Sequence, residues 1–344
     1  MDAGATSKDT AAGKGKKAEE QSVRKWDSTA KEARGPASVY KSTIPVNEKD
    51  YDEFNLWWMR VWGDQIGSMN QKTSIGSVRF TDVDSPRGPV SPVDTLQLFQ
   101  VKISETKGLM WPLQVYGFVA ARDLLDYKRN IIFQRERDNC QIITDGFPYL
   151  ALTGPARAVV LVDPVYFEVV LKVKGTRQSE DQDLIFIADS FRDTGPLDSS
   201  VFNCVYTSKI STVELTFGHI IMSVEAVVSM KVINGSWPDG FEGVFAAKTA
   251  SINDMAIRLV MTDDDNKLPL ADDGRIKLQR HVICAEIEDG EYLEVLVDAY
   301  GDGGQRLNDG LHFRPQERGR LKGTLEVDSC EIEVTVTWFL IKWC

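Results

Sequence analysis

The stretch CEIEVTVTWFL, residues 330–340, has the pattern that decides the fold of this chain. Glutamate and threonine occupy the odd positions from 331 to 337, and apolar side chains occupy the even positions from 332 to 340: Ile332, Val334, Val336, Trp338 and Leu340. Successive side chains of a β-strand point to opposite faces, so this alternation places one face on a core and the other in solvent. The stretch therefore predicts a half-buried antiparallel strand.

The same two-residue period recurs in residues 224–232 and 293–299, and turn-forming pairs such as Asn234-Gly235 and Asp289-Gly290 separate such runs. Earlier candidate strands cover residues 96–103, 113–121, 130–135, 149–152, 158–162, 166–174 and 184–188. About a dozen short strands with few helical patterns between them predict an all-β fold. We expect an antiparallel β-sandwich, either one large sandwich or two in tandem.

The composition divides the chain into three segments. Residues 1–42 are rich in Ala, Gly, Ser, Lys and Glu, and they hold too few aliphatic residues to offset the entropy of ordering, so they are predicted to be a disordered tail. Residues 43–92 are interpreted as a helix and a lead-in segment, and 93–344 as the β-rich domain. A subdivision of that domain into 93–208 and 209–344 is a hypothesis.

Helical spacing is confined to residues 47–66, where aromatic and apolar side chains recur three or four residues apart: Tyr51, Phe54, Trp58, Val61 and Trp62. This pattern predicts a short amphipathic helix that ends at Gly63. Because the opposite face is acidic and unsuited to anionic lipid, we expect the helix to pack on its own domain.

The charge of the chain argues against nucleic acid as a partner. The formal net charge is -11, and residues 1–42 contribute +3 of it, which leaves -14 for the body. Such a body repels phosphate backbones. The chain also has no apolar run typical of a signal peptide or of a membrane span, and its five cysteines form no Cys-x-x-Cys pair. We therefore expect an intracellular protein, cytoplasmic or nuclear, without a membrane partner.

The sequence contains no recognisable catalytic motif, so we predict neither an enzyme nor a cofactor. The three histidines, His219, His281 and His312, are scattered, and His219 lies within the apolar strand pattern LTFGHII. We interpret His219 as a histidine of the sheet. No residues are predicted to bind a metal.

The acidic stretch MTDDDNKLPLADDG, residues 261–274, admits two interpretations. Its carboxylates could bind calcium, but their spacing does not fit a calcium-binding loop of the EF-hand type. The alternative is a solvated hairpin with Asp273-Gly274 at its turn, and this is the interpretation we prefer.

The stretch FQRERDNCQ, residues 133–141, combines four charges with a cysteine. If the strand over 130–133 stays extended, Arg135 and Arg137 share one side, and Glu136 and Asp138 the other. Asp138-Asn139 then supplies a hairpin turn, and residues 140–143 return as the next strand. The preferred interpretation is a structural one. The alternative is an interaction surface formed by Arg135, Arg137 and Asp138.

Several longer segments point to a known family: PLQVYGFVAARD (112–123), FQRERDNCQ (133–141), LTGPARAVVLVDPVYFEVVLKVKG (152–175), TVELTFGHIIMSVEAVV (212–228) and CEIEVTVTW (330–338). Over about residues 93–341 the chain resembles the grass-expanded plant domain of unknown function 6598. That resemblance implies similarity to the carboxy-terminal half of jasmonate-induced ribosome-inactivating proteins, and a stress or defence role. It supplies no catalytic residue. Glu32-Ala33-Arg34 is only superficially like the glycosidase signature, so glycosidase activity is not expected.

Three functions are compatible with these observations. The leading hypothesis is a non-enzymatic β-rich interaction module of a plant cell, stress or defence associated, with a protein partner. The second is a sandwich that binds a small ligand or a carbohydrate through exposed aromatic residues such as Trp237 and Tyr300. The third is a protein related to translation inhibitors that lacks the glycosidase site.

Overall fold

The structure is a computed structural model that describes residues 23–25, 38–44, 46–77, 91–192, 195, 197–301 and 303–341. In this part of the chain, strands predominate and form three sheets. They are accompanied by one α-helix, α2 (Glu48–Ile66), and by two short 3-10 turns, η1 (Arg137–Asn139) and η2 (Gln178–Glu180). The prediction of an all-β sandwich fold is confirmed.

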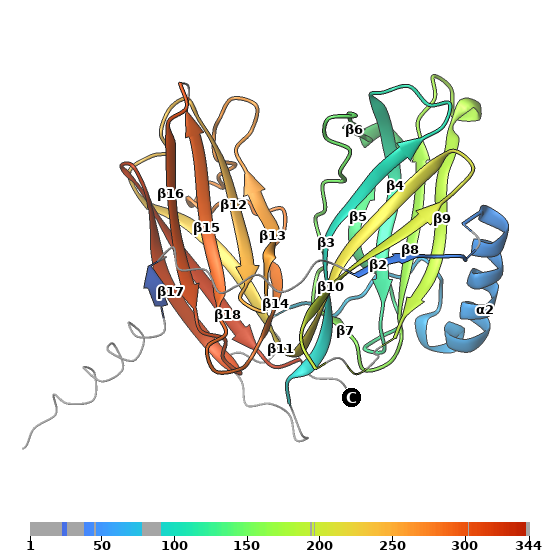
Figure 1. Ribbon diagram of the computed structural model, residues 1–344, viewed down its shortest axis with the longest axis horizontal. Helices are drawn as coiled ribbons and strands as arrows, with labels where there is room; N and C mark the ends of the chain where they lie inside the picture. The colour runs from blue at the N-terminus through green and yellow to red at the C-terminus, as the bar shows by residue number, and fades with distance from the viewer. Residues whose placement is uncertain are drawn as a thin grey trace, which may run out of the picture.

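Figure 1 shows two sandwiches side by side. One outer sheet has the order β5-β4-β8-β9, with β6 also beside β4. Its strands are β4 (Leu113–Arg122), β5 (Asn130–Arg135), β6 (Gln141–Ile143), β8 (Val165–Val173) and β9 (Gln182–Phe191). We call this the first sheet, and the sandwich that contains it the first sandwich. Its core includes Val101, Val119, Phe133, Val169 and Phe217.

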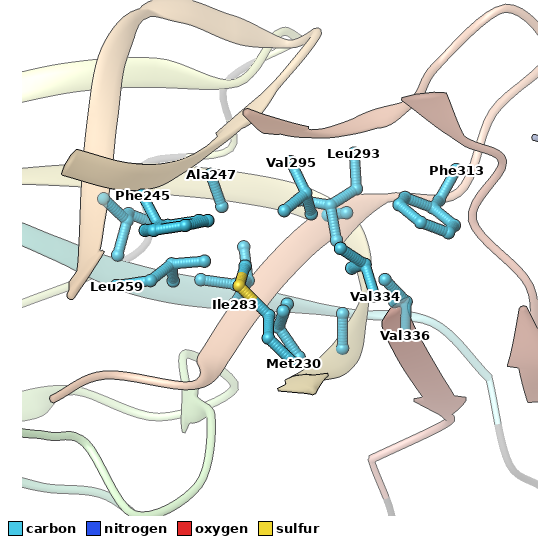
Figure 2. Packing of buried hydrophobic residues seen from close by; sticks show 14 of the residues in the cluster. Met230, Phe245, Ala247, Leu259, Ile283, Leu293, Val295, Phe313, Val334 and Val336 are labelled. Carbon is cyan, nitrogen blue, oxygen red and sulfur yellow. The ribbon is translucent and has the colours of Figure 1, made fainter. Parts of the chain in front are cut away.

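The second sandwich has the outer sheet β1-β16-β15-β12-β13. These strands are β1 (Val23–Lys25), β16 (Arg306–Phe313), β15 (Leu293–Gly301), β12 (Phe241–Thr249) and β13 (Ile252–Met261). Figure 2 shows its core, where Phe245 and Leu259 pack near Ile283, and Val295 near Val334.

Both outer sheets pack on one shared sheet of eight strands. It consists of β2 (Ser38–Lys41), β3 (Val93–Thr106), β7 (Val159–Val160), β10 (Ser200–Thr207), β11 (Ser211–Asn234), β14 (Val282–Glu286), β17 (Arg318–Val327) and β18 (Cys330–Phe339). The opening stretch of the sequence analysis forms β18. As its alternation predicts, Ile332, Val334, Val336 and Trp338 are fully buried, whereas Glu331 and Glu333 are only half-buried.

The 24-residue strand β11 belongs to both sandwiches. Its first half pairs with β3 and β10, and its second half pairs with β14 and β18. In the first half of β11, odd-numbered side chains point into the first core: Val213, Leu215 and Phe217. In the second half, even-numbered side chains point into the second core: Val224, Ala226 and Val228. The two cores are thus joined by a continuous strand that begins at Ser211, close to the hypothesised subdivision near residue 209.

A bulge marks the point at which β11 passes from one core to the other. The register shifts between Ile220 and Ser223, and Met222 has a φ of 42°. Asp94 of β3 fixes this bulge, because one carboxylate oxygen accepts a 3.0 Å bond from the Met222 N–H and the other lies 2.8 Å from His219 Nε2. His219 is fully buried, which confirms that it is a histidine of the sheet.

Helix α2 covers the outside of β8 and β9 (Figure 1). Its first turn is capped by the Asn47 side chain, which accepts a 3.2 Å bond from the Asp50 N–H. The predicted end at Gly63 is wrong, because the helix continues to Ile66 and is terminated by Gly67, which has a φ of 73° and donates to the Gly63 carbonyl. The packing of the helix on its own domain is confirmed by the burial of Tyr51, Trp58 and Ile66. Val61 of the predicted stripe is instead exposed.

Two strands lie within the segment predicted to be a tail. Residues 23–25 form β1 beside β16, and residues 38–41 form β2, which pairs parallel with β10. The rest of residues 1–37, and residues 78–90 of the predicted lead-in segment, lie outside the described residues.

Candidate functional site: a basic groove on the first sheet

Helix α2 covers only part of the outer face of the first sheet, and a groove of about 390 Å³ lies on the part beside it. Strands β4, β5 and β8 form its floor, and the segment that follows α2 supplies a wall through Asn70 and Lys72. We call it the basic groove because its charged residues are Lys72, Arg129, Arg135, Lys172 and Glu136.

The floor of the groove depends on a glycine. Gly117 of β4 has a φ of 119°, and a Cβ atom at this position would lie 2.1 Å from the carbonyl oxygen of Val170. Only glycine permits this close approach of β4 to β8. The aromatic side chains of Tyr116 and Phe118, on either side of Gly117, also line the groove.

The wall is held by backbone pairing with the residue before β5. Arg129 donates its N–H to the Gln71 carbonyl at 3.0 Å, and its own carbonyl accepts from the Thr73 N–H at 2.9 Å. This pairing brings Lys72 alongside Arg129 at the edge of the groove.

A buried charge cluster anchors α2 and the wall to the sheet. The carboxylate of Glu168, in β8, accepts from Arg122 Nε, from Arg129 Nε at 2.9 Å and from the Tyr51 hydroxyl at 2.8 Å. The Arg129 guanidinium also donates to the Asn70 side chain at 2.8 Å. Burial lowers the pKa of Arg122, and burial together with the charge of Glu168 raises the pKa of Tyr51 well above its usual value.

This cluster was not predicted from the sequence. Glu168 occupies an even position of VYFEVVLKV, on the face that the alternation assigns to solvent, but α2 covers that face. One feature of the sequence could have indicated the cluster. The aromatic stripe of the helix needs a surface to pack on, and the residues of that surface become buried.

The groove has an excess of positive charge. Arg129 is neutralised by Glu168, and Lys172 lies 2.9 Å from Asp183. Lys72 and Arg135 form no ion pair with any residue that the structure describes. Two unpaired cations therefore face solvent in a chain whose formal net charge is -11.

The hairpin predicted for FQRERDNCQ is wrong. Both β5 and β6 pair antiparallel with β4, β5 with residues 117–121 and β6 with residues 113–115. The two strands consequently run in the same direction along one edge of β4. The turn η1 connects the two strands without reversing the direction of the chain, and Arg137 to Asn139 adopt 3-10 geometry in it.

The three residues of the predicted interaction surface have separate environments. Arg135 lines the groove. Arg137 is bound by Asp181, which accepts from its Nε at 2.8 Å and from its Nη2 at 3.0 Å. Asp138 is almost fully exposed, 3.8 Å from the Lys174 ammonium. Of the three, only Arg135 contributes to the groove.

Asp181 connects η1 to the loop after β8. Besides Arg137, it accepts from the Gly175 N–H at 2.8 Å and from the Tyr116 hydroxyl at 2.7 Å. The hydrogen bonds from Arg137, and then those from Gly175 and Tyr116, hold the pKa of this carboxyl well below its usual range. The role of Arg137 is therefore to fix the shape of the groove's end.

Two other expected sites have structural explanations. The Trp237 indole donates to the Phe241 carbonyl at 2.8 Å and packs against Gly243, so it does not present a free ring to a carbohydrate. Tyr300 is about half exposed, with Arg306 over its ring. Neither is joined by further exposed aromatic residues in a described pocket.

In the acidic stretch, Asp263 accepts from the Asp265 and Lys267 N–H groups at 3.0 and 2.8 Å. Leu270 and Ile276 form an antiparallel bridge around Asp273-Gly274, as the hairpin interpretation predicts. Across the described residues, no three His, Cys, Asp or Glu side chains gather as metal ligands would. No helix in that part of the chain combines the length and apolar composition needed to span a membrane.

Comparison with protein families gives one match. The model described as "Domain of unknown function (DUF6598)" matches residues 95–336. The chain belongs to this family. The sequence motifs thus identified the DUF6598 domain correctly, while the similarity to ribosome-inactivating proteins stays a prediction. No curated protein matches this chain.

Among solved structures, the DUF6598 chain is similar to human GIVD cytosolic phospholipase A2, with a TM-score of 0.23 and 9% identity over 74% of this chain and 31% of the phospholipase. It thus spans about a third of that protein's length. A structure of the two C2 domains of Extended-Synaptotagmin 2 matches with a TM-score of 0.25 and 8% identity over 79% of this chain and 100% of that one. At these scores, neither similarity bears on the function of this chain.

Proposed function

We propose that this DUF6598 protein is a non-enzymatic interaction module whose basic groove binds an acidic segment of a partner protein. The observation that carries the proposal is a pair of uncompensated cations in the groove, Lys72 and Arg135, beside a single carboxylate of its lining, Glu136. Lys72 and Arg135 are not neutralised by described neighbours, so they are available to a carboxylate-bearing partner.

The size of the groove and the charge of the whole chain favour a short acidic segment over a long polyanion. A groove of about 390 Å³ admits a few side chains. A nucleic acid would extend beyond it and meet the repulsion of a chain with a net charge of -11. Phe118 and Val170 offer an apolar surface beside the cations, on which the stems of glutamate side chains can pack.

The lining offers charged and aromatic side chains for binding, and its described residues include no histidine, cysteine or serine. We place this module in the cytosol or nucleus of a plant cell, in a stress or defence response. The compartment is inferred from the composition of the sequence, and the plant setting and the stress role from the sequence resemblance.

The proposal is tested with a fluorescein-labelled hexaglutamate peptide, whose binding to the full chain is measured by fluorescence anisotropy at low ionic strength. We expect saturable binding that weakens as salt is added, because exposed charges are screened. The double variant Lys72→Ala, Arg135→Ala should weaken binding about tenfold, since each exposed contact contributes on the order of 0.5–1 kcal/mol.

The matched control is Arg275→Ala, Lys277→Ala, which removes the same charge from exposed positions of the second sandwich. It should bind the peptide as the unchanged protein does. Equal losses for the two double variants would show that the peptide responds to overall charge, and the groove would then have no special role.

A further inference from the structure

A second hollow, of about 200 Å³, lies where the two sandwiches meet. Strand β3 of the shared sheet contributes Phe99 and Gln100, and the second sandwich contributes Ala256 and Arg258 of β13 together with Arg280. The segment after β6, in the first sandwich, contributes Phe147, Tyr149, Leu150 and Leu152. In Figure 1, β13 and β3 occupy the facing sides of the two sandwiches. We call this hollow the inter-sandwich pocket.

Arg280 is a buried cation without a carboxylate partner among the described residues. Its guanidinium donates to three backbone carbonyls of the first sandwich: Gly154 at 2.9 Å, Leu98 at 2.6 Å and Phe99 at 3.4 Å. Burial, and next the positive charge of Arg258, lower the pKa of Arg280 to about 10, so it stays protonated at neutral pH. These bonds fix Arg280 in one position at the pocket wall.

Arg258 is the second cation of the pocket. Its guanidinium lies over the ring of Phe147, 5.7 Å from the ring centroid, and forms no ion pair with any described carboxylate. Burial lowers its pKa. A partly buried guanidinium without a counter-ion is electrostatically unfavourable, and an anion placed beside it would relieve this cost.

Besides the amide of Gln100, the remaining walls are apolar and aromatic: Phe99, Phe147, Tyr149, Leu150 and Leu152. We propose that the inter-sandwich pocket binds a small organic carboxylate with a planar apolar body. The fork of N–H donors of Arg258 matches the two oxygens of a carboxylate, and the rings of Phe147 and Tyr149 receive the body. This inference is independent of the basic groove, which lies on another face of the first sandwich.

The volume limits the size of the ligand. A pocket of 200 Å³ corresponds to roughly seven water molecules at about 30 Å³ each. This volume suits a single ring with a carboxylate. Because both sandwiches line the pocket, a bound anion would contact both and stabilise their arrangement.

The test uses benzoate as the probe and benzamide as its neutral isostere, with binding to the full chain measured by saturation-transfer NMR and by thermal shift. We expect benzoate to give saturation transfer and to raise the melting temperature, and benzamide to do neither. Arg258→Met should weaken benzoate binding at least tenfold, because it removes the charge and keeps an apolar stem of similar length.

Two further variants keep the test decisive. Arg275→Met removes an exposed arginine of the same sandwich and should leave benzoate binding unchanged. Phe147→Ala changes a half-exposed residue outside both cores, so it should weaken binding while the fold is retained. Absence of a benzoate signal, equal binding of benzamide, or full binding by both Arg258→Met and Phe147→Ala would overturn the proposal.

Discussion

Two pairs of buried or partly buried arginines in this molecule have different neighbours. Arg122 and Arg129, beneath helix α2, share the carboxylate of Glu168. Arg258 and Arg280, between the sandwiches, have an aromatic ring and backbone carbonyls as neighbours, but no described carboxylate. A carboxylate fixes the first pair and so holds the fold together, whereas the second pair keeps a net charge that a ligand can meet.

The same contrast occurs between two residues of FQRERDNCQ. Arg137 is bound by Asp181 through two hydrogen bonds, and Arg135, two positions earlier, is left unpaired at the groove. We therefore propose that an arginine of this chain serves stability where a distant part of the chain places a carboxylate beside it, and recognition where none is placed. Substitution of an arginine, or of the carboxylate that binds it, tests this rule.

The largest effect is expected for Glu168→Gln. This change leaves the charges of Arg122 and Arg129 buried without a counter-ion, so we expect the free energy of unfolding to fall by about 3–5 kcal/mol. Urea unfolding followed by tryptophan fluorescence measures the loss, and Trp58 of α2 reports on the same region.

The control for this substitution is Glu333→Gln, which breaks a partly exposed pair with Lys322 on β17 and should change stability by no more than about 1 kcal/mol. If Glu168→Gln were as stable as this control, the buried cluster would not be what holds α2 on the sheet.

A smaller loss is expected for Arg137→Ala, because its pair with Asp181 is partly exposed. The variant should have a lower melting temperature than the unchanged protein, since Asp181 loses two donors and η1 loses its connection to the loop after β8. Differential scanning calorimetry measures the shift. An unchanged melting temperature would return Arg137 to the candidate recognition residues.

The alternation of apolar residues was sufficient to predict β18, β15 and the second half of β11. A strand with one buried face shows this alternation in its own residues, whatever its neighbours are. The charged sites could not be predicted in this way. The alternation of β8 places Glu168 on the face opposite the core, and the helix that buries it lies more than a hundred residues earlier in the chain. The direction of β6 depends on its pairing with β4, which the Asp138-Asn139 dipeptide does not encode.

Acid pH provides a third test, directed at Asp181. Its pKa in the folded protein lies below the value of about 3.9 expected in the unfolded chain. The stabilisation from this carboxylate is therefore fully present above about pH 4 and is lost as the pH falls through the folded pKa. The difference in melting temperature between the unchanged protein and Asp181→Asn should accordingly be constant near pH 7 and narrow below about pH 4. A difference that stays constant from pH 7 to pH 3 would contradict this assignment.

The smallest effect on stability is expected for Arg135→Ala, and here the contrast with Arg137 is sharpest. Arg135 forms no ion pair with a described residue, so the free energy of unfolding should change by no more than about 0.5 kcal/mol. Binding of the hexaglutamate peptide should nevertheless weaken, by roughly two- to fivefold, because the loss of one exposed contact is worth on the order of 0.5–1 kcal/mol. Calorimetry and anisotropy on the same preparation separate the two quantities. A lowered melting temperature with unchanged peptide binding would place Arg135 with Arg137 among the structural arginines, and the distinction between paired and unpaired arginines would then fail in this stretch of the sequence.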